Sequence, residues 1–234
     1  MKILKNVPIK GFIETSFVDW PGKICAVLFF PRCNFRCRYC HNADLVLRPD
    51  ALADIDPATI AARLSELHGW IDGVCVSGGE PTLSGCLPDV LSSIKKQGLL
   101  AKLDTNGSNP GVLRSLIGQG LIDYVAMDVK SCLDETSYCK IIQAPNMLES
   151  VQESIRILLE GTVEYEFRIT TVPGFHGPED IYRLARDLNG ASRLRIQNFN
   201  PSESILDPGL RSVRPFTEEE IHHMQDRVDM LISA

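Results

Sequence analysis

The sequence lacks several features that would assign it to other protein classes. No apolar run approaches the roughly 18–20 residues needed to span a bilayer, and the first residues lack the long apolar stretch of a signal peptide. Positive charge is not in excess, because 24 lysines and arginines stand against 30 aspartates and glutamates, a net charge of −6. This balance gives no global electrostatic support to a nucleic-acid partner. We expect a cytoplasmic protein that binds neither nucleic acid nor membrane.

The chain also lacks low-complexity tracts and residue-level repeats. Its 234 residues, 44% of them hydrophobic, are enough to bury the core of one α/β domain of the larger kind. What recurs is a strand-like apolar run followed by a helix-like stretch. We therefore expect residues 1–234 to form a single domain, with six strands at Ala26–Phe30, Gly73–Ser77, Leu100–Asp104, Tyr124–Val129, Tyr165–Val172 and Leu194–Phe199.

Capping signals predict where three helices begin. Asp56 followed by proline is typical of an N-cap with proline in the first turn. Asn146 and Glu149 have the spacing of a capping box for a helix over residues 146–160, and Thr217 and Glu220 have the same spacing for a C-terminal helix over residues 217–233.

Six strand–helix steps imply parallel strands, in either a doubly wound sheet or a partial β/α barrel. In both folds, ligands collect at the carboxyl ends of the strands. The unusual residues of this chain follow the predicted strands or lie within them. They are the cysteine loop 31–42, Gly78-Gly79-Glu80, Asp104-Thr105-Asn106-Gly107, Asp128-Val129-Lys130 and Arg168.

The loop after the first predicted strand carries Cys33, Cys37 and Cys40, but no fourth cysteine. Three thiolates can hold three corners of a cubane iron–sulfur cluster, whereas ferredoxin-type clusters use four. A zinc site completed by His41, a covalent haem at Cys37-x-x-Cys40-His41 and a loop of free thiols are the alternatives. The missing fourth ligand favours a cluster with one iron open to substrate.

The remaining cysteines are scattered along the chain. Cys25 and Cys75 lie in strand-like runs and are expected to be small buried hydrophobic residues. Cys132 and Cys139 lie nearer the predicted site, and the sequence leaves their role open.

The C-x3-C-x2-C loop with an aromatic residue before its last cysteine, together with the Gly78-Gly79-Glu80 turn, resembles the radical S-adenosylmethionine (SAM) superfamily. Tyr39-Cys40-His41-Asn42, Asp19-Trp20-Pro21-Gly22 and Asp104-Thr105-Asn106-Gly107 resemble the glycyl-radical activating enzymes within it. The stretch from Gln197 to Pro208 is most similar to the activating protein of anaerobic ribonucleoside-triphosphate reductase. The resemblance covers about residues 12–210 and implies a partial (β/α)6 barrel.

The resemblance implies one [4Fe–4S] cluster on Cys33, Cys37 and Cys40, with its open iron chelated by S-adenosylmethionine. Gly78 and Gly79 would let main-chain carbonyls approach the methionine ammonium. An ordinary tight turn is the alternative for these glycines and for Asp104-Thr105-Asn106-Gly107. The other implied cofactor-binding residues are Glu80 as an acceptor or brace, Lys130 and Arg168 for the methionine carboxylate, Asp104 and Asp128 for a monovalent cation, and the motif residues Tyr39, His41, Thr105 and Asn200. Asn200 departs from the pattern, since some activating enzymes have a histidine there. A salt bridge to Asp128 is the alternative for Lys130 and Arg168.

The implied reaction is reductive cleavage of S-adenosylmethionine and formation of a glycyl radical on a partner enzyme. The implied electron donor is a low-potential protein such as flavodoxin or ferredoxin. Residues 12–22 and 201–215 are expected to contact the partner, with Trp20 and Phe216 as candidate apolar anchors. The alternative, favoured for Phe216, is that both are core aromatic residues. The alternatives are a small-molecule radical enzyme such as a 7-carboxy-7-deazaguanine synthase and a non-enzymatic metal-binding protein.

Overall fold

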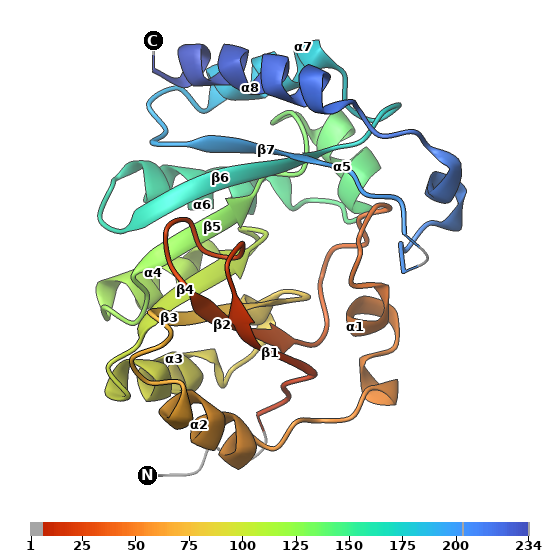
Figure 1. The fold of residues 1–234 in the computed structure, drawn as a ribbon. Coiled ribbons are helices and arrows are strands. Elements are labelled where there is room, and N and C mark those ends of the chain that lie inside the picture. Colours follow the sequence, from red (N-terminus) through yellow and green to blue (C-terminus); the bar gives the residue numbers. More distant parts are fainter. Residues whose placement is uncertain (1–6, 203, 234) are drawn as a thin grey trace. The chain divides into compact units, whose positions relative to one another are not determined.

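The computed structural model describes residues 7–202 and 204–233, which form a mixed α/β fold (Figure 1). The strands are β1 (Gly11–Ser16), β2 (Cys25–Phe30), β3 (Gly73–Gly78), β4 (Leu100–Thr105), β5 (Tyr124–Asp128), β6 (Glu164–Thr171) and β7 (Leu194–Asn198). The helices are α1 (Ala43–Leu47), α2 (Pro57–Glu66), α3 (Leu87–Lys96), α4 (Pro110–Gly118), α5 (Glu135–Ile142), α6 (Leu148–Leu159), α7 (Pro178–Asp187) and α8 (Glu218–Ile232). Three 3-10 turns lie at Pro49–Ala51, Pro81–Leu83 and Pro208–Ser212. None of the described helices has the length and apolar character needed to cross a membrane.

The six predicted strands are confirmed as β2 to β7, and strand order in the sheet follows chain order from β1 to β7. β2, β3 and β4 pair in parallel, and so do β6 and β7. The prediction missed β1, which pairs antiparallel with β2, with Gly11 opposite Phe29. Three consecutive residues of β1 are exposed. A strand with only one buried residue has no continuous apolar run. Such a run is the signal that identified the other six strands.

The chain forms two compact units. Among the described residues, the first unit comprises 7–34, 44–105 and 111–125, and the second comprises 35–43, 106–110, 126–202 and 204–233. The sequence predicted the buried strands of both units because parallel strands covered by helices on their faces are apolar along most of their length.

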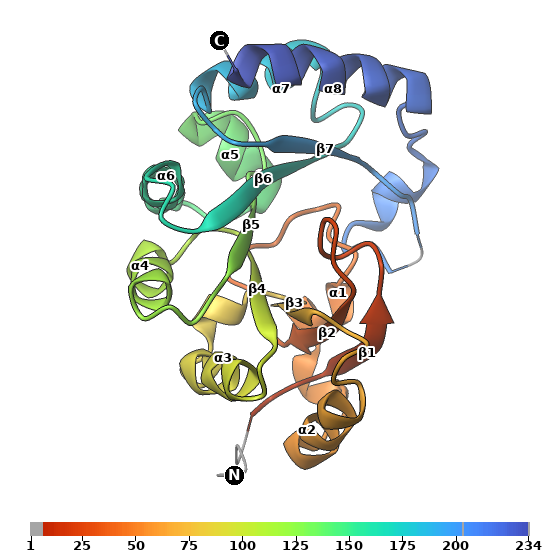
Figure 2. The ribbon, with the colours of Figure 1, turned by 60° about the vertical axis from the view of Figure 1, so that its left-hand side comes forward.

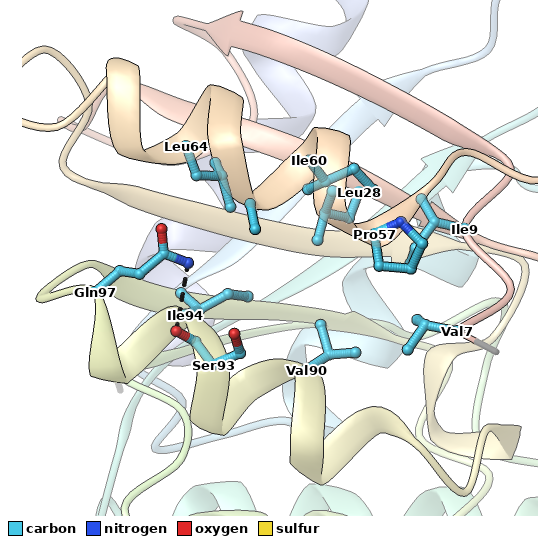
Figure 3. Close-up of a pocket in the computed structure, with 11 residues that line it drawn as sticks. Val7, Ile9, Leu28, Pro57, Ile60, Leu64, Val90, Ser93, Ile94 and Gln97 are labelled. Atoms are coloured by element: carbon cyan, nitrogen blue, oxygen red, sulfur yellow. Dashed lines mark hydrogen bonds between the residues drawn. The ribbon is translucent and has the colours of Figure 1, made fainter. Parts of the chain in front are cut away.

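In the first unit, helices α2 and α3 face each other across a small apolar pocket (Figure 3). The predicted N-cap of α2 is confirmed, because the Asp56 side chain accepts a hydrogen bond from the Ala58 N–H at 3.0 Å. Ile60 of α2 and Ile94 of α3 line the pocket, whose volume is about 40 Å³. This space is far smaller than a typical small-molecule site of roughly 300–1,000 Å³. We interpret it as a packing gap in the core.

In the second unit, α8 packs beside α7 and against β7 (Figure 2). The predicted capping box of α8 is confirmed. The Glu220 N–H donates to Thr217 Oγ1 at 3.2 Å, and the Thr217 N–H donates to Glu220 Oε2 at 2.7 Å. These two bonds pair main-chain donors that the first turn of a helix otherwise leaves without partners.

The capping box predicted for α6 is wrong. The helix begins at Leu148, its N-cap is Met147, and no side chain caps it. Asn146 instead adopts a left-handed conformation with φ of 59°, and its N–H donates to Glu135 Oε1 at 3.1 Å. Asn146 therefore belongs to the turn that precedes the helix, a conformation that asparagine tolerates better than most residues.

Candidate functional site

The predicted cysteine loop is confirmed as irregular chain between β2 and α1. The structure describes all eight cysteines, and none of these eight forms a disulfide. The Cys40 N–H donates to the Cys37 carbonyl at 2.9 Å, which places these two residues on one tight turn. Burial raises the pKa of the Cys40 thiol, so the thiolate form needs a compensating positive charge such as a metal ion. Three cysteines on one loop fit an iron–sulfur cluster.

Main-chain hydrogen bonds within the second unit hold the later part of this loop. The Leu206 N–H donates to the Cys40 carbonyl at 3.0 Å, and the Asp207 N–H donates to the Arg38 carbonyl at 2.9 Å. The Arg38 guanidinium forms an ion pair with the Asp207 carboxylate at 2.7 Å and lies 4.8 Å from the Phe175 ring centroid. The segment from Cys37 to Cys40 is therefore held in place by residues that are distant from it in the sequence.

The Gly78-Gly79 turn packs directly on main chain of the first unit. The Gly79 N–H donates to the Phe30 carbonyl at 2.9 Å, and the Glu80 N–H donates to the Arg32 carbonyl at 2.7 Å. A Cβ atom on Gly79 would lie only 1.9 Å from the Arg32 oxygen. Gly78 has φ of +123°, a conformation that L side chains rarely adopt. The turn thus requires glycine even without a cofactor.

Glu80 is buried and braces this turn. Its Oε1 accepts hydrogen bonds from the Thr82 N–H at 3.1 Å and from Thr105 Oγ1 at 2.8 Å. The structure therefore brings together two predicted site residues, Glu80 from the end of β3 and Thr105 from the end of β4. The bracing role that the sequence left open for Glu80 is present in the structure.

Asp104 pairs with a residue that the sequence analysis missed. The Lys102 ammonium forms a hydrogen-bonded ion pair with the Asp104 carboxylate, and the Lys102 side chain is fully buried. Lys102 Nζ also lies 3.8 Å from Cys75 Sγ and 5.9 Å from the centroid of the Tyr124 ring. Lys102 therefore gives Asp104 a fixed positive charge, and a monovalent cation at this carboxylate stays a prediction.

Asp128, Lys130 and Arg168 form a buried charge cluster in the second unit. Arg168 Nε lies 2.8 Å from Asp128 Oδ1, and Lys130 Nζ lies 3.1 Å from Asp128 Oδ2. Burial alone would raise the pKa of Asp128, but the two cations lower it well below its usual range. Burial likewise opposes the charged form of Lys130, yet Asp128 and other neighbours raise its pKa well above the usual value. All three groups are charged at neutral pH.

Tyr39 lies beside this cluster, and its hydroxyl is buried without a hydrogen-bond partner. Burial raises its pKa well above the usual range, so the hydroxyl is a neutral donor. Its ring lies edge-on to His176, with centroids 6.3 Å apart. A buried hydroxyl without a partner costs free energy. Such an orphaned polar atom within the cysteine loop fits a site that binds a polar cofactor.

His41 and Asn200, two further predicted residues, occupy the same part of the second unit. His41 Nδ1 lies 3.5 Å from Ser202 Oγ, and the ring is 6.3 Å from that of Phe199. Asn200 is exposed in the segment after β7. Burial lowers the pKa of His41, so this imidazole is neutral at physiological pH.

The two candidate apolar anchors lie in different environments. Trp20 is buried, with 2% of its surface exposed and its ring 6.0 Å from that of Tyr124, so it is a core aromatic residue and not a surface anchor. The exposed apolar residues of the same segment are Phe17 and Val18, at 73% and 77%. Phe216 is half-buried.

The cysteines outside the loop divide between confirmed and open assignments. Cys25 and Cys75 are completely buried, as predicted. Cys132 is also buried, with its thiol 3.3 Å from the Asp180 carbonyl oxygen. This contact gives Cys132 a role in packing.

Comparison with known proteins identifies the family. Residues 27–188, more than half of the chain, match the family described as the radical SAM superfamily. The chain belongs to the radical SAM superfamily. The expected α/β fold of the radical SAM type is therefore confirmed, and the protein is a radical SAM enzyme whose cofactors are a [4Fe–4S] cluster and S-adenosylmethionine.

Relatives within the superfamily confirm the resemblance to activating enzymes. A putative glycyl-radical enzyme activating enzyme of Methanocaldococcus jannaschii is 32% identical over 84% of this chain and 81% of its own length. The pyruvate formate-lyase 1-activating enzyme of Escherichia coli K12 is 28% identical over 80% of the chain and 78% of its own length. The crystal structure of Streptococcus suis SuiB bound to S-adenosylmethionine shares the fold, with a TM-score of 0.65 and 15% identity over 88% of this chain. The chain spans about half the length of SuiB.

Proposed function

We propose that this radical SAM enzyme is an activase that generates a glycyl radical on anaerobic ribonucleoside-triphosphate reductase. The observation that carries the activase role is the 32% identity to a putative glycyl-radical enzyme activating enzyme over 84% of the chain. The choice of reductase rests on the resemblance of residues 197–208 to its activating protein. When bound, the reduced cluster would supply an electron, and S-adenosylmethionine would supply the radical that removes a hydrogen atom from a glycine of the partner.

We assign cluster binding to Cys33, Cys37 and Cys40, within a single radical SAM domain that spans residues 1–234. Support comes from their shared loop and from the turn that joins Cys37 to Cys40. Their deprotonated sulfurs would be the iron ligands, since thiolate is the form that binds iron in such clusters. The proposed electron donor is a low-potential flavodoxin or ferredoxin.

The charge cluster of the second unit would bind the methionine carboxylate. Lys130 and Arg168 contribute two positive charges and Asp128 one negative charge, so the three side chains sum to +1. A buried site with net positive charge favours an anionic ligand. Lys130 keeps further ammonium hydrogens beyond the one directed at Asp128, because an ammonium has three.

The remaining assignments concern the rest of the cofactor. The Gly78 and Gly79 main chain would receive the methionine ammonium, with Glu80 and Thr105 holding the turn in place. Tyr39 would offer its buried hydroxyl as a donor to the cofactor. The other proposed cofactor contacts are His41 and Asn200. A monovalent cation at Asp104 or Asp128 would have to displace an ammonium or guanidinium group that already pairs with that carboxylate.

The test is activation of a defined partner under anaerobic conditions. Reduced, cluster-reconstituted protein is mixed with S-adenosylmethionine and anaerobic ribonucleoside-triphosphate reductase, and we expect the electron paramagnetic resonance doublet of a glycyl radical. The control is a reductase in which the acceptor glycine is replaced by alanine, which should give no doublet. A doublet on pyruvate formate-lyase but not on the reductase would overturn the choice of partner. Turnover of a deazaguanine precursor without any glycyl radical would overturn the activase role.

A further inference from the structure

Buried side chains hold the Lys130 main chain from both sides. The Lys130 N–H donates to the Tyr138 hydroxyl at 3.2 Å, and the Lys130 carbonyl lies 3.0 Å from His176 Nε2. Tyr138 lies on α5 and is 1% exposed, while His176 lies in the turn after β6 and is 3% exposed. Two buried groups from different parts of the second unit therefore converge on one residue just past the end of β5.

The hydrogen bonds of His176 fix its tautomer. The Val172 N–H donates to His176 Nδ1 at 3.1 Å, so Nδ1 is the acceptor nitrogen. The proton of the neutral ring therefore sits on Nε2 and is donated to the Lys130 carbonyl. The same ring lies edge-on to Tyr39. One imidazole thus contacts both the aromatic residue of the cysteine loop and the main chain of the charge cluster.

We propose that His176 and Tyr138 are positioning residues that set the direction in which the Lys130 ammonium projects. This inference rests on the proposed function, in which Lys130 binds the methionine carboxylate. The strand ends at Asp128 and the Val129 N–H makes a ladder bond to the Arg168 carbonyl at 2.8 Å. Lys130 lies beyond this bond, so side chains must hold its main chain in place of a neighbouring strand.

The consequence is specific to cofactor binding. A lysine side chain has several rotatable bonds, and its ammonium is placed accurately only when its main chain is fixed. Loss of either anchor should therefore move the ammonium relative to Asp128 and to the cofactor carboxylate. Affinity for S-adenosylmethionine should fall, while cluster assembly on the cysteines should be unaffected.

A series of substitutions at His176 separates its two hydrogen bonds. The amide nitrogen of glutamine reaches about as far as Nε2, so His176→Gln should keep the donor to Lys130 and bind S-adenosylmethionine with wild-type affinity. The shorter His176→Asn should lose that donor and bind about tenfold more weakly, the fold-change that one hydrogen bond supports. The measurement is the S-adenosylmethionine dissociation constant of anaerobically reconstituted protein, compared at equal iron content.

A pair of tyrosine substitutions provides the matched control. Tyr165 is another buried tyrosine of the second unit, and its hydroxyl accepts the Ser192 N–H at 3.2 Å, the same distance as in the Tyr138–Lys130 bond. Tyr138→Phe and Tyr165→Phe should lower the melting temperature by similar amounts, because each removes one acceptor from a main-chain donor. Only Tyr138→Phe should weaken S-adenosylmethionine binding.

Two results would overturn the positioning role. One is wild-type affinity in both His176→Asn and Tyr138→Phe, and the other is equal loss of affinity in Tyr138→Phe and Tyr165→Phe. The proposed function fails separately, through unchanged affinity in Lys130→Met or through absence of S-adenosylmethionine cleavage by the wild-type protein. Nitrogen-15 resonances of the His176 ring give an independent reading, since the inference requires the proton on Nε2.

Discussion

Replacing Gly79 with alanine should destabilise the protein before any cofactor binds. The new Cβ would lie 1.9 Å from the Arg32 carbonyl oxygen, whereas ordinary contacts begin at 3.4 Å. The main chains must therefore separate by 3.4 − 1.9 = 1.5 Å. The obstacle is a carbonyl oxygen of the main chain, so no side-chain rotation relieves it.

The expected cost follows from the contacts that this separation breaks. Two hydrogen bonds tie the turn down, from the Gly79 N–H to Phe30 and from the Glu80 N–H to Arg32. Each contributes about 0.5–1.5 kcal/mol, and overpacking adds about 1–3 kcal/mol. The sum is about 2–6 kcal/mol. Whole domains have unfolding free energies of only about 5–15 kcal/mol, so this loss should be easy to measure.

The assay is urea unfolding, and Gly85 offers a matched control. Gly85 lies six residues further along the chain and is exposed, and a Cβ atom added there would meet no other atom within 4 Å. Gly85→Ala should change the free energy of unfolding by less than about 0.5 kcal/mol. If Gly79→Ala unfolds at the same urea concentration as the wild type and loses only S-adenosylmethionine binding, the turn needs glycine for the cofactor alone. The packing explanation would then be wrong.

Three further predictions test the cluster, the partner surface and one ion pair. Cys37→Ala should lower the iron content of reconstituted protein from about four atoms per chain, while Cys75→Ala should keep it, and full iron content in Cys37→Ala would refute the cluster assignment. Phe17→Ser should raise the concentration of reductase needed for half-maximal activation without slowing partner-free S-adenosylmethionine cleavage. Trp70→Ser, at a similarly exposed aromatic residue, should leave both the required reductase concentration and the cleavage rate unchanged. If the two variants raise the required concentration equally, Phe17 does not contact the partner. Hydrogen bonds from the Arg38 guanidinium and the Gly209 N–H lower the pKa of Asp207 in the folded protein. The ionised Asp207 carboxylate therefore stabilises the fold fully above the ordinary aspartate pKa of 3.8. This stabilisation is lost as the pH falls through the lower pKa of the folded state. The stability difference between wild type and Asp207→Asn should therefore be present at neutral pH and disappear in acid, whereas a difference that persists in acid would exclude the ion pair as its cause.

The sequence predicted best what depends on short stretches of chain. Six strands were found because each is a continuous apolar run, and the residues that follow them were found because motifs and strand ends are local features. β1 was not predicted because only one of its residues is buried. Trp20 was misjudged because its neighbours in the sequence, Phe17 and Val18, are exposed while its own ring is buried. Apolar composition alone cannot separate these environments.

The supporting residues could not be predicted because their partners are distant in the sequence. His176 lies 46 residues from Lys130, and Asp207 lies 169 residues from Arg38. No local pattern marks such pairs, since a histidine or an aspartate in a loop usually faces solvent. A proline-glycine turn before His176 gives the chain its reversal, but only the fold shows which carbonyl the imidazole meets.

Lys102 shows the limit of sequence reasoning most clearly. The sequence contains Lys-x-Asp on β4 and Asp-x-Lys at the end of β5, and the two patterns place an aspartate and a lysine at the same spacing. Residues two apart on a strand share a face, so Lys102 and Asp104 can form an ion pair on β4, and they do. Lys130 lies just past the end of β5 and also pairs with Asp128. On β4 the pair of Lys102 and Asp104 sums to zero charge. Beyond β5, Arg168 adds a second cation to Asp128 and makes the sum +1. A third residue from another strand therefore distinguishes two sites that look alike in the sequence, and the site proposed for the cofactor carboxylate is the one with the second cation.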